Sequence, residues 1–411
     1  MYVMSLLKTA LKTVTTPHTR DKLKEAAFKA YMAAFFSGKR ERDGSVPFGV
    51  NLLGHVRGDF GLGESCRLVA GGLEASGVPF SVYNLPMNGP AGENNLDWAA
   101  REQEAYPYSV NLVHLNPGEL ANALWRLKPG ELRKRYNIAY WLWELPEFPE
   151  EWHYTFRLFD EIWTPAEFIS RALRKCTGLP VYTMPYGLAK PATDPACDRA
   201  FFGLPEDVFL FMLSYDGNSV SERKNPEGAI RAYVRAFGKD EAGVGLVIKA
   251  THESAGGMAR MRALLEGYPN VVVLTESYGK AQFNSLIGCV DAYVSLHRAE
   301  GFGLVMAEAM LLGTPVIATN WSANTEFMNE DVACMVDARV VALEREYPPY
   351  HRGYHWAEPD EAAAADWMRK LYRDEAFRTG LVQRAKAHMA QKCSVQAAGA
   401  AMGKRLEELR Q

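Results

Sequence analysis

Two glutamates in the stretch RAEGFGLVMAEAMLL, Glu300 and Glu308, stand where their neighbours are small or apolar. Residues 304–312 are otherwise apolar on every side, which predicts a buried helix with Glu308 inside it. A buried carboxylate is unfavourable unless something pairs with it. A ligand with two neighbouring hydroxyls, such as the 2′ and 3′ hydroxyls of a ribose, would satisfy its oxygens. A buried Arg or Lys of the chain itself is the alternative, and the residue types leave both open.

Glycines surround the start of this predicted helix. Gly301 and Gly303 let the backbone approach a ligand closely, because neither carries a side chain. The free N–H groups at the start of a helix also form a site for an anion. We therefore expect Glu300 to stand at the mouth of a ligand site, with Glu308 deeper along the same helix.

The elements that must position these residues alternate between strand and helix. In the first half of the chain, apolar runs predict buried strands, and a helix begins near Gly61 and ends before Gly77. The strands are expected at residues 48–53, 78–85, 108–115, 137–143, 161–166 and 179–185, and further helices at Glu119–Leu127 and Glu167–Cys176. Strands that alternate with helices favour a parallel, doubly wound sheet.

The same alternation restarts in the second half, after a proline-rich stretch at residues 185–205 that predicts a linker. Strands are expected at residues 207–215, 243–250, 270–277, 291–297 and 315–319, and helices at 226–237, 258–265, 304–312 and 361–372, with an aromatic loop at 346–360. We therefore expect an α/β fold of two Rossmann-like domains facing across a cleft, at residues 46–190 and 200–390, with a last helix at 394–411 packing back on the first domain. Ligands of such sheets bind at the carboxyl ends of the strands.

The bulk composition excludes several classes of protein. The 411 residues carry a net charge of −3, which gives no general attraction to nucleic acid. No apolar run reaches the roughly 18 residues that a membrane span needs. The six cysteines are scattered without zinc spacing, so we expect them to be reduced. We expect no signal peptide, because Met1 to Ala10 lacks a long apolar region and a cleavage site. These features favour a cytoplasmic protein.

The first 45 residues differ from the rest, with nine Lys and Arg against four Asp and Glu. Apolar residues recur there at helical spacing, which predicts a basic amphipathic arm. Such a helix binds an anionic membrane surface, in which case the protein would lie on the inner face of the cell membrane. Packing on the protein itself or on a second subunit is the alternative.

Several stretches together resemble one family of enzymes. EGFGLVMAE is similar to the E-x7-E signature of retaining GT-B glycosyltransferases, most closely the large family 4. GTPVIATNWSANTEF and FLFMLSYDGNSVSERKNPEGAIRAY fit the segments around that signature, and GHVRGDFGLGESCRL and YWLWELPEFPEEWHYTF resemble the first domain of the same group. The likeness covers roughly residues 47–390, and members that assemble O-antigen and other polysaccharides, including mannosyltransferases, are the most similar. The resemblance implies a GT-B fold.

The resemblance also implies roles in the second domain. Glu308 would hold the donor ribose, and Glu300 would lie beside the hydroxyls of the transferred sugar. The backbone N–H groups of residues 301–303, Gly301, Phe302 and Gly303, would face phosphate or sugar. Arg223 and Lys224 would neutralise the diphosphate, where charge grows as the glycosidic bond breaks. The family usually separates these two cations, so Lys249 at a strand end is a second candidate, and a solvated turn is the bland alternative for the adjacent pair.

Candidates in the first domain are weaker. Gly61 and Gly63 resemble the family's glycine loop near the diphosphate and acceptor, and His114 lies where related enzymes place a histidine near the transferred sugar. The remaining candidates for contacts with sugar or acceptor are Asn116, Glu144 and Glu64. A core histidine and a helix-capping Glu64 are the alternatives. The tryptophans around Glu144 are expected to pack in the core rather than to stack on sugar.

The resemblance implies a retaining hexosyltransferase that uses a nucleotide-sugar, with mannose from GDP-mannose favoured, and a saccharide or lipid-linked acceptor in bacterial surface polysaccharide synthesis. No cofactor and no metal are expected, since the chain shows no D-x-D between strands and such enzymes use cationic side chains. A nucleotide-sugar epimerase of the same fold is one alternative. A non-catalytic scaffold that binds sugar nucleotides is another.

Overall fold

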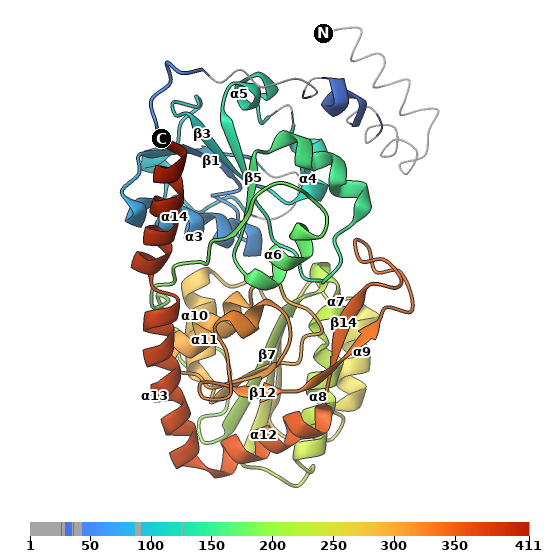
Figure 1. Cartoon of the computed structure of the whole chain (residues 1–411). Helices are drawn as coiled ribbons and strands as arrows, with labels where there is room; N and C mark the ends of the chain where they lie inside the picture. Colours follow the sequence, from blue (N-terminus) through green and yellow to red (C-terminus); the bar gives the residue numbers. More distant parts are fainter. Residues whose placement is uncertain are drawn as a thin grey trace, which may run out of the picture.

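The computed structural model describes residues 26, 29–34, 36, 43–86, 92–124 and 126–410. It contains two parallel six-stranded sheets, one in each half of the chain, with helices on their faces (Figure 1). The two Rossmann-like domains expected from the alternating pattern are therefore confirmed. Most of the predicted basic arm lies outside the described residues.

The N-terminal sheet has the order β2-β1-β3-β4-β5-β6, and every neighbouring pair is parallel. Its strands are β1 (Val50–Gly54), β2 (Phe80–Asn84), β3 (Val110–His114), β4 (Tyr136–Tyr140), β5 (Glu161–Thr164) and β6 (Val181–Thr183). Its helices are α3 (Gly61–Ser76), α4 (Pro117–Ala123), α5 (Pro129–Arg133) and α6 (Glu167–Arg174), with the 3₁₀ segments η1 (Ala99–Arg101) and η2 (Glu150–Leu158). As expected, α3 ends at Gly77, whose φ of 72° lies in the left-handed region that suits glycine.

The C-terminal sheet has the order β12-β11-β10-β7-β8-β9, again all parallel. Its strands are β7 (Phe209–Asp216), β8 (Val244–Thr251), β9 (Val271–Leu274), β10 (Ala292–Ser295), β11 (Val316–Thr319) and β12 (Cys334–Val336). The helices between them are α7 (Ser221–Lys224), α8 (Pro226–Ala236), α9 (Ala255–Leu264), α10 (Lys280–Cys289) and α11 (Leu304–Leu312), with η3 (Gly217–Ser219) and η4 (Ala323–Glu326). The strand order reverses between β7 and β10, and ligands of such sheets bind at this switch point.

The segment expected to be an aromatic loop, residues 346–360, is partly strand, so that prediction was wrong. β14 (His355–Pro359) pairs antiparallel with β13 (Ala338–Ala342), and the aromatic residues form the tip of the hairpin. The hairpin leaves the C-terminal domain and its tip points towards the N-terminal domain (Figure 1). The residues of β13 are exposed or half-buried, so its sequence lacks the alternation of apolar and polar residues that predicts a strand with one buried face.

Three helices end the chain: α12 (Glu361–Arg373), α13 (Glu375–Lys392) and α14 (Val395–Arg410). α13 runs along the C-terminal domain and α14 continues along the N-terminal domain (Figure 1). α14 packs so closely on α3 that a side chain at Gly399 would lie 2.6 Å from the Cβ of Ala75. A second contact joins α14 to β5, because Arg405 pairs with the fully buried Glu161 at 2.6 Å. The consecutive helices α13 and α14 thus pack on the C-terminal and the N-terminal domain, respectively.

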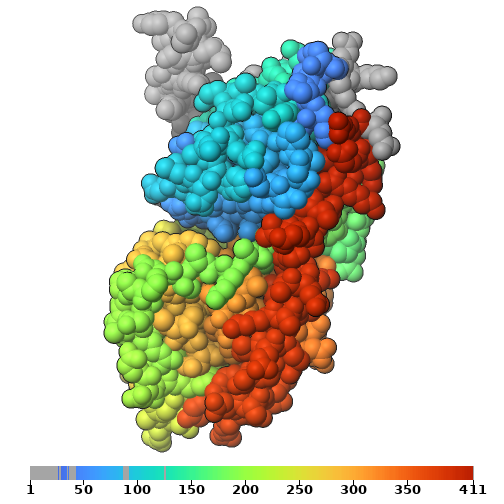
Figure 2. All heavy atoms as spheres, turned by 90° about the vertical axis from the view of Figure 1, so that its left-hand side faces the viewer, coloured from blue at the N-terminus to red at the C-terminus, as the bar shows by residue number. Residues whose placement is uncertain are grey.

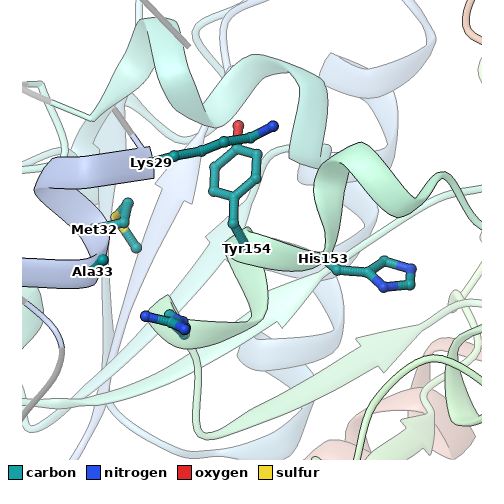
Figure 3. A pocket seen from close by; sticks show the side chains of 6 residues that line it. Lys29, Met32, Ala33, His153 and Tyr154 are labelled. Carbon is teal, nitrogen blue, oxygen red and sulfur yellow. The ribbon is translucent and has the colours of Figure 1, made fainter. Parts of the chain in front are cut away.

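The described part of the N-terminal arm packs on the protein. Residues 29–34 are helical, and Met32 is fully buried in a core cluster with Leu120, Leu124 and Phe159 of the N-terminal domain. A pocket of about 380 Å³ opens between this stretch and η2, lined by Lys29, Met32, Ala33, His153, Tyr154 and Arg157 (Figure 3). In the part of the chain that the structure describes, no helix is long and apolar enough to cross a membrane.

Candidate functional site

The switch point of the C-terminal sheet brings together two distant stretches that sequence reasoning had singled out. SERK forms the short helix α7 after β7, and RAEGFG forms the turn between β10 and α11. Asn225 joins them, because its side chain donates to the carbonyl of Leu296 at 2.9 Å and accepts from Gly228 at the start of α8. A backbone bond from Arg298 to Arg223, at 2.7 Å, completes the connection.

Glu300 lies between the two adjacent cations. Its Oε2 is 2.5 Å from Nζ of Lys224 and 3.6 Å from a guanidinium nitrogen of Arg223. Burial alone would raise the pKa of Glu300, but Lys224 and then Arg223 outweigh it and lower that pKa to about 2. The carboxylate is therefore ionised at neutral pH. A solvated turn was the alternative interpretation of Arg223 and Lys224. It does not hold for Arg223, which is buried and hydrogen-bonded.

Arg223 is held by hydrogen bonds, but one of its buried nitrogen atoms has no partner among the described residues. Its guanidinium donates to the carbonyl of Ala299 and to the hydroxyl of Ser219, both at 2.8 Å. Its Nε is buried and has no hydrogen-bond partner among the described residues. A buried donor without a partner is unfavourable, so this group is suited to an incoming anion.

The glycine turn before α11 is closely packed on both sides. Gly303 has φ of 93°, and a side chain there would lie 2.5 Å from Met306, so glycine is required. Gly301 faces the N-terminal domain, where a side chain would come within 3.6 Å of the carbonyl of Trp143. Phe302 turns inward and packs against Tyr186 and Phe327, which leaves only its backbone for a ligand.

Glu308 is 4% exposed in α11 and has one protein partner. Its Oε1 lies 2.5 Å from Nζ of Lys280, the first residue of α10, which is 43% exposed. Its Oε2 is buried and has no partner in the described part of the chain. Burial raises the pKa of Glu308, and Lys280 offsets part of that rise. The sequence left open whether a lysine of the chain or a ligand pairs with Glu308. In the structure a lysine bonds to Oε1, whereas Oε2 has no partner among the described residues.

Lys249 lies apart from Arg223 and Lys224, near the carboxyl end of β8. Its ammonium stands 5.4 Å from the ring centre of Tyr278, and its side chain is 5% exposed. Burial lowers the pKa of Lys249, while Glu276 and Asp216 act in the opposite direction. The structure thus places a third cation on the same edge of the sheet.

The glycine loop of the N-terminal domain forms the start of α3. Space around Gly61 is open, whereas a side chain at Gly63 would collide with the carbonyl of Gly58. Glu64 pairs with Arg67 at 2.6 Å, and its negative charge adds slightly to the raised pKa of Glu308, after burial as the main cause.

His114 is fully buried at the end of β3, so it offers no surface to a ligand in this structure. Its Nε2 bonds to the hydroxyl of Ser65 at 2.7 Å, Ser65 bonds to Tyr186, and its ring stacks on Tyr140. Burial lowers the pKa of His114 to about 3, so the ring is neutral. This geometry favours the core-histidine alternative, with a link through Tyr186 to the glycine turn.

The other two candidates of this domain differ in kind. Asn116 caps α4 in a capping box with Glu119 and accepts a bond from the backbone of Leu142 at 3.0 Å, which is a structural role. Glu144 instead accepts a bond from Tyr350 at the hairpin tip, at 3.0 Å, and lies close to Gly301. The tryptophans beside it are buried as expected, Trp141 among Phe148, Phe156 and Phe159.

Sequence reasoning missed four residues that the structure places at this site: Lys280, Tyr350, Tyr186 and Ser65. A lysine that opens a helix shortly before the E-x7-E segment was a signal for the first of them. Tyr186 and Tyr350 lie in segments that gave no periodic pattern, whereas Ser65 lies in the predicted helix α3 but carried no signal of its own. No cluster of three metal-ligating side chains occurs among the residues that the structure describes.

In Figure 2 the surface is hollowed between the N-terminal domain and the C-terminal domain.

Comparisons with known proteins agree with this geometry. Residues 213–346 match the family described as Glycosyl transferases group 1, and this range contains every second-domain candidate named above. No curated protein matches the sequence.

Solved structures with the same fold are numerous, and the three described next have low sequence identity to this chain. Anabaena HepE in complex with UDP and glucose has a TM-score of 0.63 and 14% identity, covering 88% of this chain and 100% of its own. A glycosyltransferase from Rickettsia africae has a TM-score of 0.64 and 10% identity over 89% of this chain and 99% of its own. Sucrose-phosphate synthase from Thermosynechococcus elongatus has a TM-score of 0.62 and 16% identity over 88% and 99%. The fold is GT-B, and with the family match it supports a GT-B glycosyltransferase.

Proposed function

We propose that the protein transfers a hexose from a nucleoside diphosphate sugar to a hydroxyl acceptor, with retention of anomeric configuration. The observation that carries the proposal is the cluster at the switch point: the ionised Glu300 held by Lys224 and Arg223, with the Nε donor of Arg223 left without a partner among the described residues. This cluster adjoins the glycine turn of α11, whose N–H groups favour an anion.

The chemistry assigned to the cluster follows the flow of charge. The bond from C1 of the sugar to the β-phosphate oxygen breaks, and the negative charge develops on that oxygen. Arg223 and Lys224 stabilise it, and Lys249 stands on the same sheet edge. The acceptor oxygen bonds to C1 on the face that the phosphate leaves, and its proton passes to the departing phosphate oxygen. Glu300 orients the sugar hydroxyls, and the closed cleft excludes water that would hydrolyse the donor.

Glu308 would accept the ribose hydroxyls at the other end of the donor. Its orphan Oε2 supports this role, since a buried carboxylate oxygen generally finds a donor. GDP-mannose remains our first donor on the sequence resemblance. UDP-glucose is the second, because HepE has been solved with UDP-glucose. We further propose that the side-chain cations make a metal ion unnecessary, which activity in EDTA tests.

The acceptor is proposed to be a saccharide or a lipid-linked saccharide of a bacterial surface polysaccharide, bound by the N-terminal domain near Glu144. We also retain the proposal that the basic arm brings the enzyme to an anionic inner membrane surface, with self-association as its alternative. Both proposals rest on the sequence pattern, and the arm's buried Met32 supports packing on the protein for its last turn.

The test begins with binding and ends with product. A thermal-shift series with GDP, UDP and ADP and their sugar conjugates identifies the donor. Incubation of that donor with and without saccharide acceptors should release nucleoside diphosphate and form a glycoside whose anomeric configuration, read by NMR, matches that of the donor. An epimerised donor without glycoside would establish the epimerase alternative, and binding without turnover would establish the scaffold.

A further inference from the structure

The ion pair between Lys280 and Glu308 is unusual for its surroundings. Glu308 is buried between Ala307, Ala309 and Met310 in α11, whereas Lys280 reaches it from the exposed start of α10. A buried ion pair adds little net stability, and an apolar residue at such a position is often neutral or stabilising. Folding alone therefore does not explain why this helix carries a carboxylate with a lysine beside it.

The two oxygens of Glu308 are not equivalent. Lys280 occupies Oε1 at 2.5 Å, while Oε2 is buried and lacks a partner among the described residues. A single carboxylate can accept from both a lysine and a hydroxyl, because each oxygen has two lone pairs. The geometry leaves Oε2, with the free lone pair of Oε1, for a ligand.

The charges around Glu308 show what Lys280 contributes. The negative charge of Glu64 in α3 raises the pKa of Glu308, and the charge of Glu308 in turn raises the pKa of the phenol of Tyr293 in β10. Lys386 of α13 approaches α11 only at its far end, beside Gly313. Within the described residues, Lys280 is therefore the cation that pairs with Glu308 and lowers its pKa against the effect of burial.

We propose that Lys280 is a positioning residue for the nucleotide: it holds Glu308 charged and oriented through Oε1, so that the carboxylate can accept the ribose hydroxyls. This inference rests on the proposed function. Two other roles of Lys280 are possible in principle and are separated by the experiment below. In one, Lys280 contacts the phosphate or the base directly; in the other, it fills the ribose site until the ligand displaces it.

These roles predict different pH profiles of binding. Without Lys280 the pKa of Glu308 rises further, so the fraction of ionised carboxylate falls at neutral pH and recovers in alkali. Nucleotide binding by K280M should therefore weaken by up to about tenfold at acid and neutral pH, and the loss should disappear in alkali. If Lys280 instead contacted the phosphate directly, K280M would bind nucleotide more weakly at every pH. If Lys280 only filled the ribose site in the free protein, K280M would bind nucleotide more tightly.

The experiment measures the Kd of the diphosphate that binds the wild type, GDP or UDP, by calorimetry from pH 6 to 9. The variants are K280M, K280R, E308Q, the double variant K280M/E308Q, and K392M as a control on an exposed helix position. We expect K280M to lose affinity at pH 7 and regain it at pH 9, K280R and K392M to resemble the wild type, and K280M to have no further effect in E308Q. A pH-independent loss or a gain of affinity in K280M would overturn the inference.

A second measurement separates this inference from the proposed function. Carbon NMR of the glutamate carboxyls in ligand-free protein should show a higher pKa of Glu308 in K280M than in the wild type. An unchanged pKa overturns the role of Lys280 even if nucleotide binds. A raised pKa in a protein that binds no nucleotide would instead contradict the proposed function.

Discussion

The hydroxyl of Tyr350 donates a 3.0 Å hydrogen bond to Glu144, and this bond joins the two domains beside the catalytic candidates. Tyr350 lies at the tip of the β13–β14 hairpin, and its ring packs on Trp143. The base of the same hairpin holds α7, because Glu358 binds Arg298 at 2.7 Å and Arg298 donates to the carbonyl of Glu222. One element therefore positions both Arg223 and the facing edge of the N-terminal domain.

Loss of the Tyr350 hydroxyl should affect turnover more than donor binding. The Y350F variant leaves Glu144 without its donor and loosens the contact between domains, so we expect kcat to fall about tenfold with a donor Kd within about threefold of the wild type. Y347F, in the same hairpin, is the matched control and should behave as the wild type. Steady-state kinetics and calorimetry check this, and an unchanged kcat in Y350F would remove the hairpin from the mechanism.

The cations that bind Glu300 should be needed for chemistry. R223A and K224A each remove positive charge where the phosphate leaves, so we expect kcat to fall by roughly 10²-fold or more. K249M is the comparison, because Lys249 lies farther along the same sheet edge. Nucleotide release under saturating donor measures the effect. If R223A and K224A keep wild-type rates while K249M loses activity, the diphosphate site lies at β8 instead.

One histidine at the hairpin tip, His351, pairs with two glutamates and should make the contact between the domains sensitive to pH. His351 lies 2.7 Å from Glu151 of the N-terminal domain and 3.0 Å from Glu346, and Glu151 chiefly raises the pKa of His351. Because the folded pKa is raised, the charged pair stabilises the protein below the ordinary histidine pKa and is lost as pH rises through the folded value. The Tm difference between wild type and H351Q should therefore shrink from pH 6 to pH 8. A constant difference would contradict it.

Two described residues of the N-terminal arm belong to the core and limit how far the arm can be shortened. Met32 and Phe36 are buried in the N-terminal domain, so removal of residues 1–45 would damage the fold, whereas removal of residues 1–25 spares them. If the arm binds membrane, the shorter truncation should lose binding to vesicles that contain anionic lipid and should keep its melting temperature. Flotation of vesicles measures this, and a change in oligomer size alone would favour the assembly alternative.

The alternating pattern predicted the fold because each parallel strand is buried on both faces and forms a continuous apolar run. Helix α11 and its buried Glu308 followed from one apolar stretch with a single charge. The hairpin did not, because β13 is largely exposed and its partner β14 follows aromatic residues that carry no period of two. α13 was missed although Phe377, Leu381 and Ala385 recur at helical spacing.

The candidate site was harder to predict than the fold, because its geometry depends on contacts between distant segments. Sequence placed Glu300 near Arg223 and Lys224 only through a family likeness, and the strand order of the sheet explains that proximity. It could not tell that His114 is buried against Ser65, nor that Tyr350 reaches Glu144 from another domain. Contacts between residues far apart in the chain do not change the local spacing of apolar residues, so that spacing cannot predict them.

A structure of the protein with its bound nucleoside diphosphate tests the central claim most directly. The account predicts that the ribose hydroxyls lie within hydrogen-bond distance of Glu308, with Lys280 still on Oε1, and that the diphosphate lies between Arg223 and the N–H groups of residues 301–303. A nucleotide bound elsewhere, with Glu308 paired to Lys280 alone, would contradict it.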